Sequence, residues 1–136
     1  MSYAAVTKQT SRYREAEVAS ASAGQLVLVI YDHVLVNMAR ARLRVADTDG
    51  SARSEALERA RAGVTELLVT LDRERGGELA GNLASLYTFW LSELSVLGVK
   101  PKIDRLDAIV TMVTELRGAF SEAIALATPV TSLAVS

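Results

Sequence analysis

Asp32 and His33 are the residues of this 136-residue chain whose types come closest to an acid–base pair. An imidazole can exchange a proton near neutral pH, and a carboxylate can orient it. On a helix, however, consecutive side chains point about 100° apart, so these neighbours cannot couple directly. We therefore predict that His33 is exposed and non-catalytic. Asp32 is interpreted as a rim carboxylate that pairs with an arginine of its own or a neighbouring helix.

The sequence lacks the residues that other common catalytic and metal sites require. The sequence has one histidine and no cysteine, which excludes disulfides, thiolate ligands and the paired Glu-x-x-His motifs of di-iron bundles. Gly76-Gly77 lacks the other residues of a phosphate-binding loop, and we interpret it as the C-terminal cap of a helix. We predict no enzyme activity, no metal and no cofactor.

Composition and charge narrow the class of protein further. Half of the residues are apolar, and 15 Lys and Arg oppose 16 Asp and Glu, for a net charge of -1. No excess charge favours nucleic acid or an anionic membrane. The longest nearly apolar run, residues 26–36, is too short to span a bilayer, and the N-terminus lacks the apolar region of a secretory signal. These features predict one soluble intracellular domain.

The elements that position these residues follow from the sparse glycines and prolines, which leave four helix-sized intervals. We predict helices over about 22–47, 51–75, 79–97 and 101–128, the first starting at a capping box, Ser22-Ala23-Gly24-Gln25. Short connections make neighbouring helices antiparallel. The predicted fold is all-α: an antiparallel up-down four-helix bundle of residues 21–128, with a mobile N-terminal arm (1–20) and a flexible C-terminal tail (129–136).

Helical periodicity assigns faces to each predicted helix. In the first helix, a polar stripe is predicted to face water: His33, Asn37, Arg40, Arg44 and Asp47. In the later helices, apolar residues are predicted to face inward: Leu57, Ala60, Val64, Leu67, Leu68 and Leu71; then Leu79, Leu83, Leu86, Tyr87, Trp90, Leu94 and Leu97; then Ile103, Leu106, Val110, Val113, Leu116, Phe120 and Ile124.

More apolar residues are present than one core face needs. Phe89, Trp90 and Leu91 are consecutive, so they cannot all point into one core. Val29 and Val36 flank the polar stripe, and Val69 lies off the inward face of its helix. If these residues are contiguous, they form a groove for an amphipathic helix or an extended chain. The alternative is that they are scattered, as single exposed apolar residues commonly are.

Several short motifs occur in an order that resembles the flagellin export chaperone family, FliS. They are Tyr13 and Val18, then ASAGQL at 21–26, IYD at 30–32, LDRERGGELA at 71–80, Asn82-Leu83 and Leu86-Tyr87. The resemblance covers residues 13–126. The chain departs from the family pattern at Ala23, where proline is usual, at Thr88, at Leu97-Gly98 and at Phe120.

The resemblance implies a cytosolic chaperone that binds the disordered C-terminal segment of flagellin. It further implies that binding prevents premature polymerisation and assists delivery to the flagellar type III export apparatus. In this family the N-terminal arm lies over part of the groove. The motif residues and the surplus apolar residues together give the candidate residues for binding flagellin, which are Tyr13, Val18, Val29, Tyr31, Val36, Val69, Phe89 and Leu91. The alternative is a non-enzymatic bundle that uses the same surface for another helical partner or for self-association, as a monomer or weak homodimer.

Overall fold

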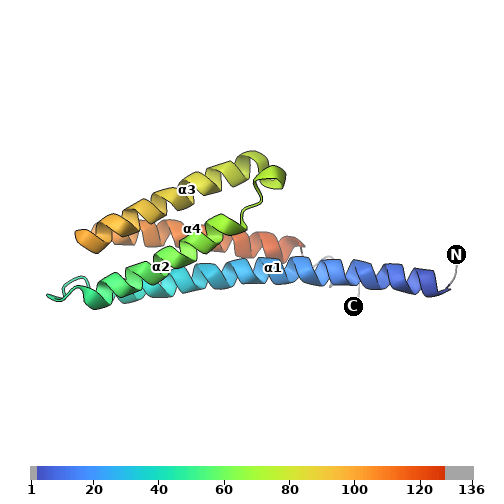
Figure 1. Ribbon diagram of the computed structural model, residues 1–136, viewed down its shortest axis with the longest axis horizontal. Helices are drawn as coiled ribbons and strands as arrows, with labels where there is room; N and C mark the ends of the chain where they lie inside the picture. Colours follow the sequence, from blue (N-terminus) through green and yellow to red (C-terminus); the bar gives the residue numbers. More distant parts are fainter. Residues whose placement is uncertain (1–2, 128–136) are drawn as a thin grey trace.

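The computed structural model describes the backbone of residues 3–127 and the side chains of residues 23–127. This part of the chain forms four α-helices, which are α1 (Tyr3–Leu43), α2 (Ser51–Thr70), α3 (Arg73–Val99) and α4 (Ile103–Ala127). In Figure 1, α1 runs along the whole length of the structure and continues beyond the other three helices. The predicted all-α four-helix bundle is confirmed.

The packing order of the helices follows their order in the chain. Among the described residues, α1 packs against α2 and α4, and α3 packs against the same two helices. The helices α1 and α3 therefore lie diagonally across the bundle, as Figure 1 shows. The α1–α2 interface is the most extensive of the four, and the α3–α4 interface is the least.

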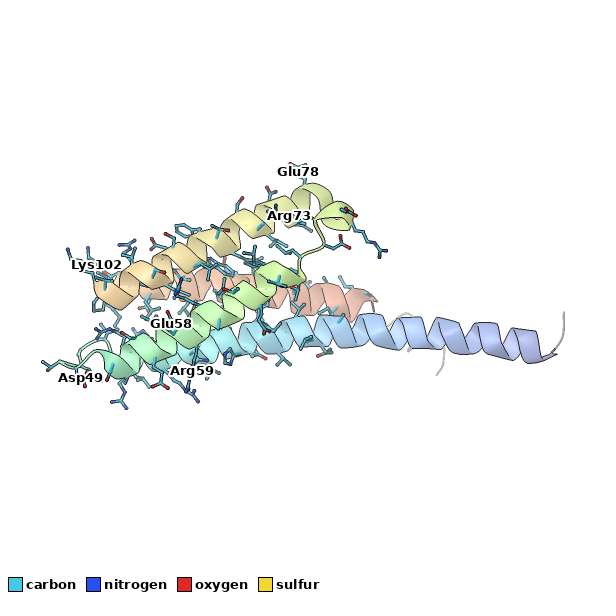
Figure 2. All side chains as sticks on the ribbon, viewed as in Figure 1. Asp49, Glu58, Arg59, Arg73, Glu78 and Lys102 are labelled. Carbon is cyan, nitrogen blue, oxygen red and sulfur yellow. The ribbon has the colours of Figure 1, made fainter. Side chains whose placement is uncertain are left out.

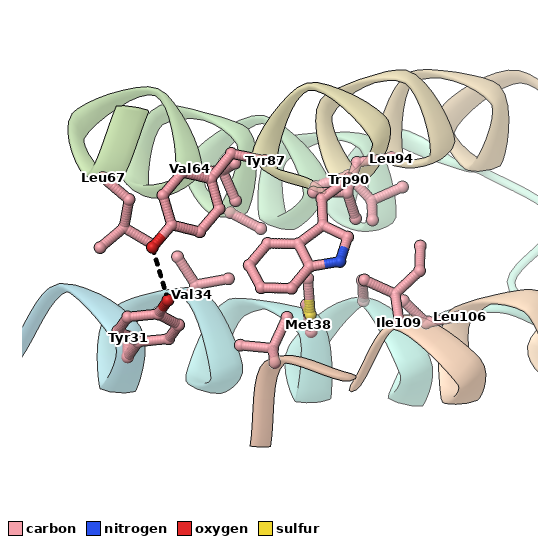
Figure 3. Close-up of a cluster of buried hydrophobic side chains, with 14 of the residues drawn as sticks. Tyr31, Val34, Met38, Val64, Leu67, Tyr87, Trp90, Leu94, Leu106 and Ile109 are labelled. Carbon is pink, nitrogen blue, oxygen red and sulfur yellow. Dashed lines mark hydrogen bonds between the residues drawn. The ribbon is translucent and has the colours of Figure 1, made fainter. Parts of the chain in front are cut away.

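The core is formed by large side chains from all four helices, with Trp90 at its centre. Trp90, Tyr31 and Tyr87 are at most 1% exposed. Figure 3 shows Trp90 and Met38 pointing toward each other between the helices. The inward residues predicted for the second helix are confirmed, because Leu57, Ala60, Val64 and Leu67 are buried and Leu68 and Leu71 pack against the same cluster.

The start predicted for the first helix is wrong. α1 begins at Tyr3, so Ser22 lies inside a helix and does not cap one. The physical reason is that no glycine or proline interrupts residues 3–23, which are rich in alanine and so favour a helix. The mobility of residues 1–20 stays a prediction. The predicted tail, 129–136, lies outside the described residues.

The connection between α2 and α3 also differs from the prediction. α2 ends at Thr70, and a new helical turn starts at once because the Asp72 carboxylate accepts a hydrogen bond from the Arg75 backbone N–H at 3.1 Å. The double glycine is therefore not the C-terminal cap of α2. Instead, Gly77 bends the chain inside α3, with φ +52° and ψ −128°, a conformation that side chains with a Cβ rarely adopt.

For three residues the predicted burial or exposure of the side chain is wrong. Leu79 is 66% exposed and Ile103 is 40% exposed, because each lies in the first turn after a bend, at an end of the bundle. Asn37 is only 1% exposed, although it was assigned to the water-facing stripe. It is covered because α2 approaches α1 closely on this side, where a Cβ at Gly63 would lie 2.6 Å from Val34 Cγ2.

Candidate partner-binding surfaces

An exposed apolar stripe runs along the outer face of α1. Val29 is 61% exposed, Val36 is 49% exposed and Leu43 is 80% exposed. These residues lie seven positions apart, which places them on one face of a helix. We call Val29, Val36 and Leu43 the α1 stripe. Sequence reasoning selected the two valines but missed Leu43, although the same spacing of seven identifies it.

Phe89 and Leu91 lie on different sides of α3. Phe89 is 47% exposed, whereas Leu91 is half-buried and packs against the core. Leu91 is seven positions after Ala84, which is buried, so both lie on the same inward flank of the helix. Of the two residues, Phe89 is therefore the one that opens onto the surface.

An ion pair between α3 and α4 shows which neighbouring helix lies beside Phe89. Glu93 of α3 accepts a hydrogen bond from Arg105 Nε of α4 at 3.1 Å, so this side of α3 is turned toward α4. Phe89 lies four positions before Glu93, and Val96 lies three positions after it, so both flank the ion pair on that side. Val96 is 39% exposed.

The facing side of α4 is also apolar. Met112, Leu116 and Ala119 follow Arg105 by seven, eleven and fourteen positions, which places them on the side of α4 that carries the ion pair. Met112 and Leu116 are half-buried, and Ala119 is exposed. We call the apolar residues around this seam the Phe89 surface; they are Phe89, Val96, Met112, Leu116 and Ala119.

Val69 and Tyr31, two further predicted residues, lie elsewhere in the bundle. Val69 is 78% exposed on α2. Tyr31 is fully buried in the core, so it is a packing residue and not a surface contact in this conformation. The side chains of Tyr13 and Val18 lie outside the described residues. The α1 stripe lies on α1 and Phe89 lies on the diagonal helix α3. The role of these residues in partner binding stays a prediction.

Polar contacts hold α4 against its neighbours. Arg117 of α4 binds Asp32 of α1 through Nε and Oδ1 at 2.6 Å, which confirms the predicted arginine partner of this carboxylate. Arg42 of α1 binds Asp107 of α4 at 2.7 Å, and this hydrogen bond lowers the pKa of the Asp107 carboxyl. Among the described residues, every ion pair between two helices includes α4.

Asp32 and His33, the candidate acid–base residues, both lie exposed on α1. His33 is exposed, as predicted, and its ring lies 3.4 Å from Asn37 Nδ2. No three His, Cys, Asp or Glu side chains cluster as metal ligands within the described part. None of the described helices combines the length and the apolar character that a membrane crossing needs.

Comparison with known proteins adds an independent finding. Residues 6–127 match the family described as "Flagellar protein FliS". The chain is similar to the flagellar secretion chaperone FliS of Campylobacter jejuni, with 30% identity over 110 residues that cover 81% of this chain and 86% of that protein. It is similar to FliS of Salmonella typhimurium, with 29% identity covering 79% and 81% of the two chains. It also matches the chaperone FliSB of Pseudomonas aeruginosa, with 28% identity covering 76% and 82%.

Proposed function

This chain belongs to the FliS family of flagellar secretion chaperones, and we propose that its client is flagellin, bound through the flagellin C-terminal segment. The role is non-enzymatic and is carried out in the cytosol. Binding keeps flagellin from polymerising before export and assists its delivery to the flagellar type III export apparatus.

The physical basis of this function is competition for apolar surface. An amphipathic segment that assembles by burying its apolar face cannot assemble while a chaperone covers that face. A disordered segment loses conformational freedom when it binds, so part of the contact free energy is offset and the complex remains reversible. Reversibility suits a protein that must release its client at the export apparatus.

The observation that carries the proposal is the Phe89 surface. Phe89 exposes almost half of its side chain beside the least extensive helix–helix interface of the bundle. Large aromatic side chains contribute strongly to protein interfaces, and half-buried apolar neighbours add apolar surface for a client helix. We therefore assign flagellin binding first to this surface, with Phe89 as its central residue.

Two versions of flagellin test the client segment. The protein is titrated with a full-length flagellin and with the same flagellin lacking its last ~40 residues, a length sufficient to wrap a small bundle as helix or extended chain. We expect binding of the full-length client only. Equal affinity for the two flagellins would contradict the proposal.

A matched pair of variants tests the surface. Phe89→Asp should weaken flagellin binding by about tenfold or more, because a desolvated carboxylate replaces an aromatic anchor. Val99→Asp, which changes an 89% exposed apolar residue at the end of the same helix, should leave binding unchanged. Circular dichroism should show both variants folded. Equal loss of binding by the two variants would remove Phe89 from the site.

Self-association is the alternative use of the apolar surfaces. Light scattering over a range of concentrations distinguishes it from client binding. A homodimer that persists when full-length flagellin is added would favour the alternative, whereas a monomer that forms a complex with flagellin supports the chaperone function.

A further inference from the structure

A cleft between α1 and α2 lies apart from the Phe89 surface. It has a volume of about 320 Å³. Its lining combines three arginines with one acidic, one amide and three apolar side chains, which are Arg40, Arg44, Arg59, Glu55, Asn37, Leu43, Ala52 and Ala56. We call it the α1–α2 cleft.

The lining of the α1–α2 cleft carries excess positive charge. Arg59 is neutralised by Glu55, with Nη2 and Oε1 2.7 Å apart. Arg44 lies 3.6 Å from Asp47, and Arg40 forms no ion pair with the described residues. Arg44 is thus paired with Asp47 as Arg59 is with Glu55, and Arg40 is the arginine of the lining without an ion pair among the described residues. Figure 2 shows Arg59 on the side of α2 that runs beside α1.

Asn37 adds an unpaired polar group to this cleft. Its side-chain Nδ2 donates to the His33 carbonyl oxygen at 2.9 Å, which fixes the orientation of the amide. Its Oδ1 accepts no hydrogen bond from the described residues, although Asn37 is only 1% exposed. A buried acceptor without a donor is unfavourable, so this amide oxygen lowers the stability of the unbound bundle.

The apolar rim of the cleft continues into the α1 stripe. Leu43 belongs to both, and Arg40 lies between Val36 and Leu43 on the flank of α1 that faces α2. The stripe from Val29 to Leu43 extends for about 21 Å of helix. A binding partner complementary to this surface has apolar side chains along one line and negative charges beside that line.

We propose that the α1–α2 cleft and the α1 stripe bind an acidic amphipathic helix of a second protein. Carboxylates of this helix contact Arg40 and Arg44, and its apolar side chains cover Val36 and Leu43. The apolar rim and the Glu55 carboxylate disfavour a nucleic-acid backbone, which offers negative charge without apolar side chains. This site is distinct from the proposed flagellin site, because it lies on α1 and α2 and not on α3 and α4.

A designed peptide serves as the probe. It is an acetylated and amidated helical peptide of about 16 residues, long enough to cover the stripe, with leucines three and four positions apart and glutamates beside them. A second peptide has lysine at every glutamate. We expect fluorescence anisotropy to show binding of the acidic peptide, weakened by added salt, and no binding of the basic peptide. Equal binding of the two peptides, or binding of neither, would overturn the proposal.

Two double variants locate the contact. Arg40→Glu with Arg44→Glu should lower affinity for the acidic peptide by about tenfold or more. Arg73→Glu with Arg75→Glu makes the same charge change at the start of α3, which Figure 2 shows at the far end of the bundle through Arg73, and should change affinity by less than about twofold. An equal loss in both double variants means a general charge effect and would overturn the assignment.

Competition separates this site from flagellin binding and from nucleic acid. Phe89→Asp should retain the affinity for the acidic peptide, and the Arg40→Glu, Arg44→Glu variant should retain flagellin binding. Displacement of the peptide by flagellin would show one shared site and contradict a second one. Displacement by a single-stranded oligonucleotide at similar concentration would favour nucleic acid over an acidic helix.

Discussion

The hydroxyl oxygens of Tyr31 and Tyr87 lie 2.7 Å apart and join the diagonal helices α1 and α3 across the core (Figure 3). The two rings are T-shaped, with centroids 6.5 Å apart, and the Tyr31 ring also contacts Phe120 of α4 at 5.6 Å. The pKa of both hydroxyls is raised because burial disfavours the phenolate. The pair thus connects three helices through one hydrogen bond and two ring contacts.

The Tyr31–Tyr87 hydrogen bond should show strong coupling in stability measurements. Tyr31→Phe or Tyr87→Phe leaves the other hydroxyl buried without its partner, and each single variant should lower the free energy of unfolding by about 1–3 kcal/mol. The double variant removes both polar groups, so it should cost less than the sum of the two single variants. Urea denaturation of the four proteins measures the coupling, and strict additivity would show that the hydroxyls do not interact.

The same two tyrosines should make the fold sensitive to alkaline pH. Their pKa values in the folded state lie above the ordinary value of 10.0, so the folded state holds these protons more tightly than the unfolded state. The stabilisation is present in full below pH about 10 and is lost as pH rises above that value. The free energy of unfolding should therefore fall with rising pH, and less so in the Tyr31→Phe, Tyr87→Phe double variant. An identical pH slope in the two proteins would be the contrary result.

Gly63 should be required for the close packing of α1 and α2. A Cβ at this position would lie 2.6 Å from Val34 Cγ2, and Val34 is fully buried. Gly63→Ala should therefore lower the free energy of unfolding by about 1–3 kcal/mol. Gly81→Ala is the matched control, since a Cβ there meets nothing within 4 Å and alanine favours the helix, so stability should rise by about 0.5–1 kcal/mol. Thermal or urea unfolding of both variants makes the comparison.

Gly77 should be required for the bend in α3 because of its backbone conformation, and not because a side chain would lack room there. A Cβ at Gly77 meets no atom within 4 Å, but the φ of +52° is unfavourable for alanine. Gly77→Ala should cost about 1–2 kcal/mol in urea denaturation. If Gly77→Ala is as stable as Gly81→Ala, residue 77 adopts an ordinary helical conformation in solution.

Sequence periodicity predicted the fold because each helix has one dominant apolar face. The buried residues Leu83, Tyr87, Trp90, Leu94 and Leu97 of α3 lie on one line, and any packing partner must cover that line. The ends of the helices were less predictable. Asp72 caps the start of α3, before the double glycine. Because this N-cap residue lies within a continuous amphipathic pattern, the glycines that follow were interpreted as the end of the second helix.

The candidate surfaces were only partly predictable, for a geometric reason. Periodicity gives the angle between two side chains on one helix, so it separated Phe89 from Trp90. It does not give the position of the neighbouring helices, so it could not decide between Phe89 and Leu91. For the same reason, periodicity predicted that Asn37 faces water, whereas α2 covers this residue in the structure. The Glu93–Arg105 pair, which defines the Phe89 surface, joins residues whose contact depends on the α3–α4 turn.

The weak attachment of α4 has a consequence for local unfolding. Of its 25 residues, only Leu106, Ile109 and Val113 are buried, and its remaining links to α1 and α3 include solvent-exposed arginine pairs that salt weakens. Segments with little buried apolar surface open at lower free energy than the rest of a domain. Amide hydrogens in α4 should therefore exchange with solvent before those at the α1–α2 interface. We therefore expect the last helix to detach reversibly from a more stable α1–α2 pair.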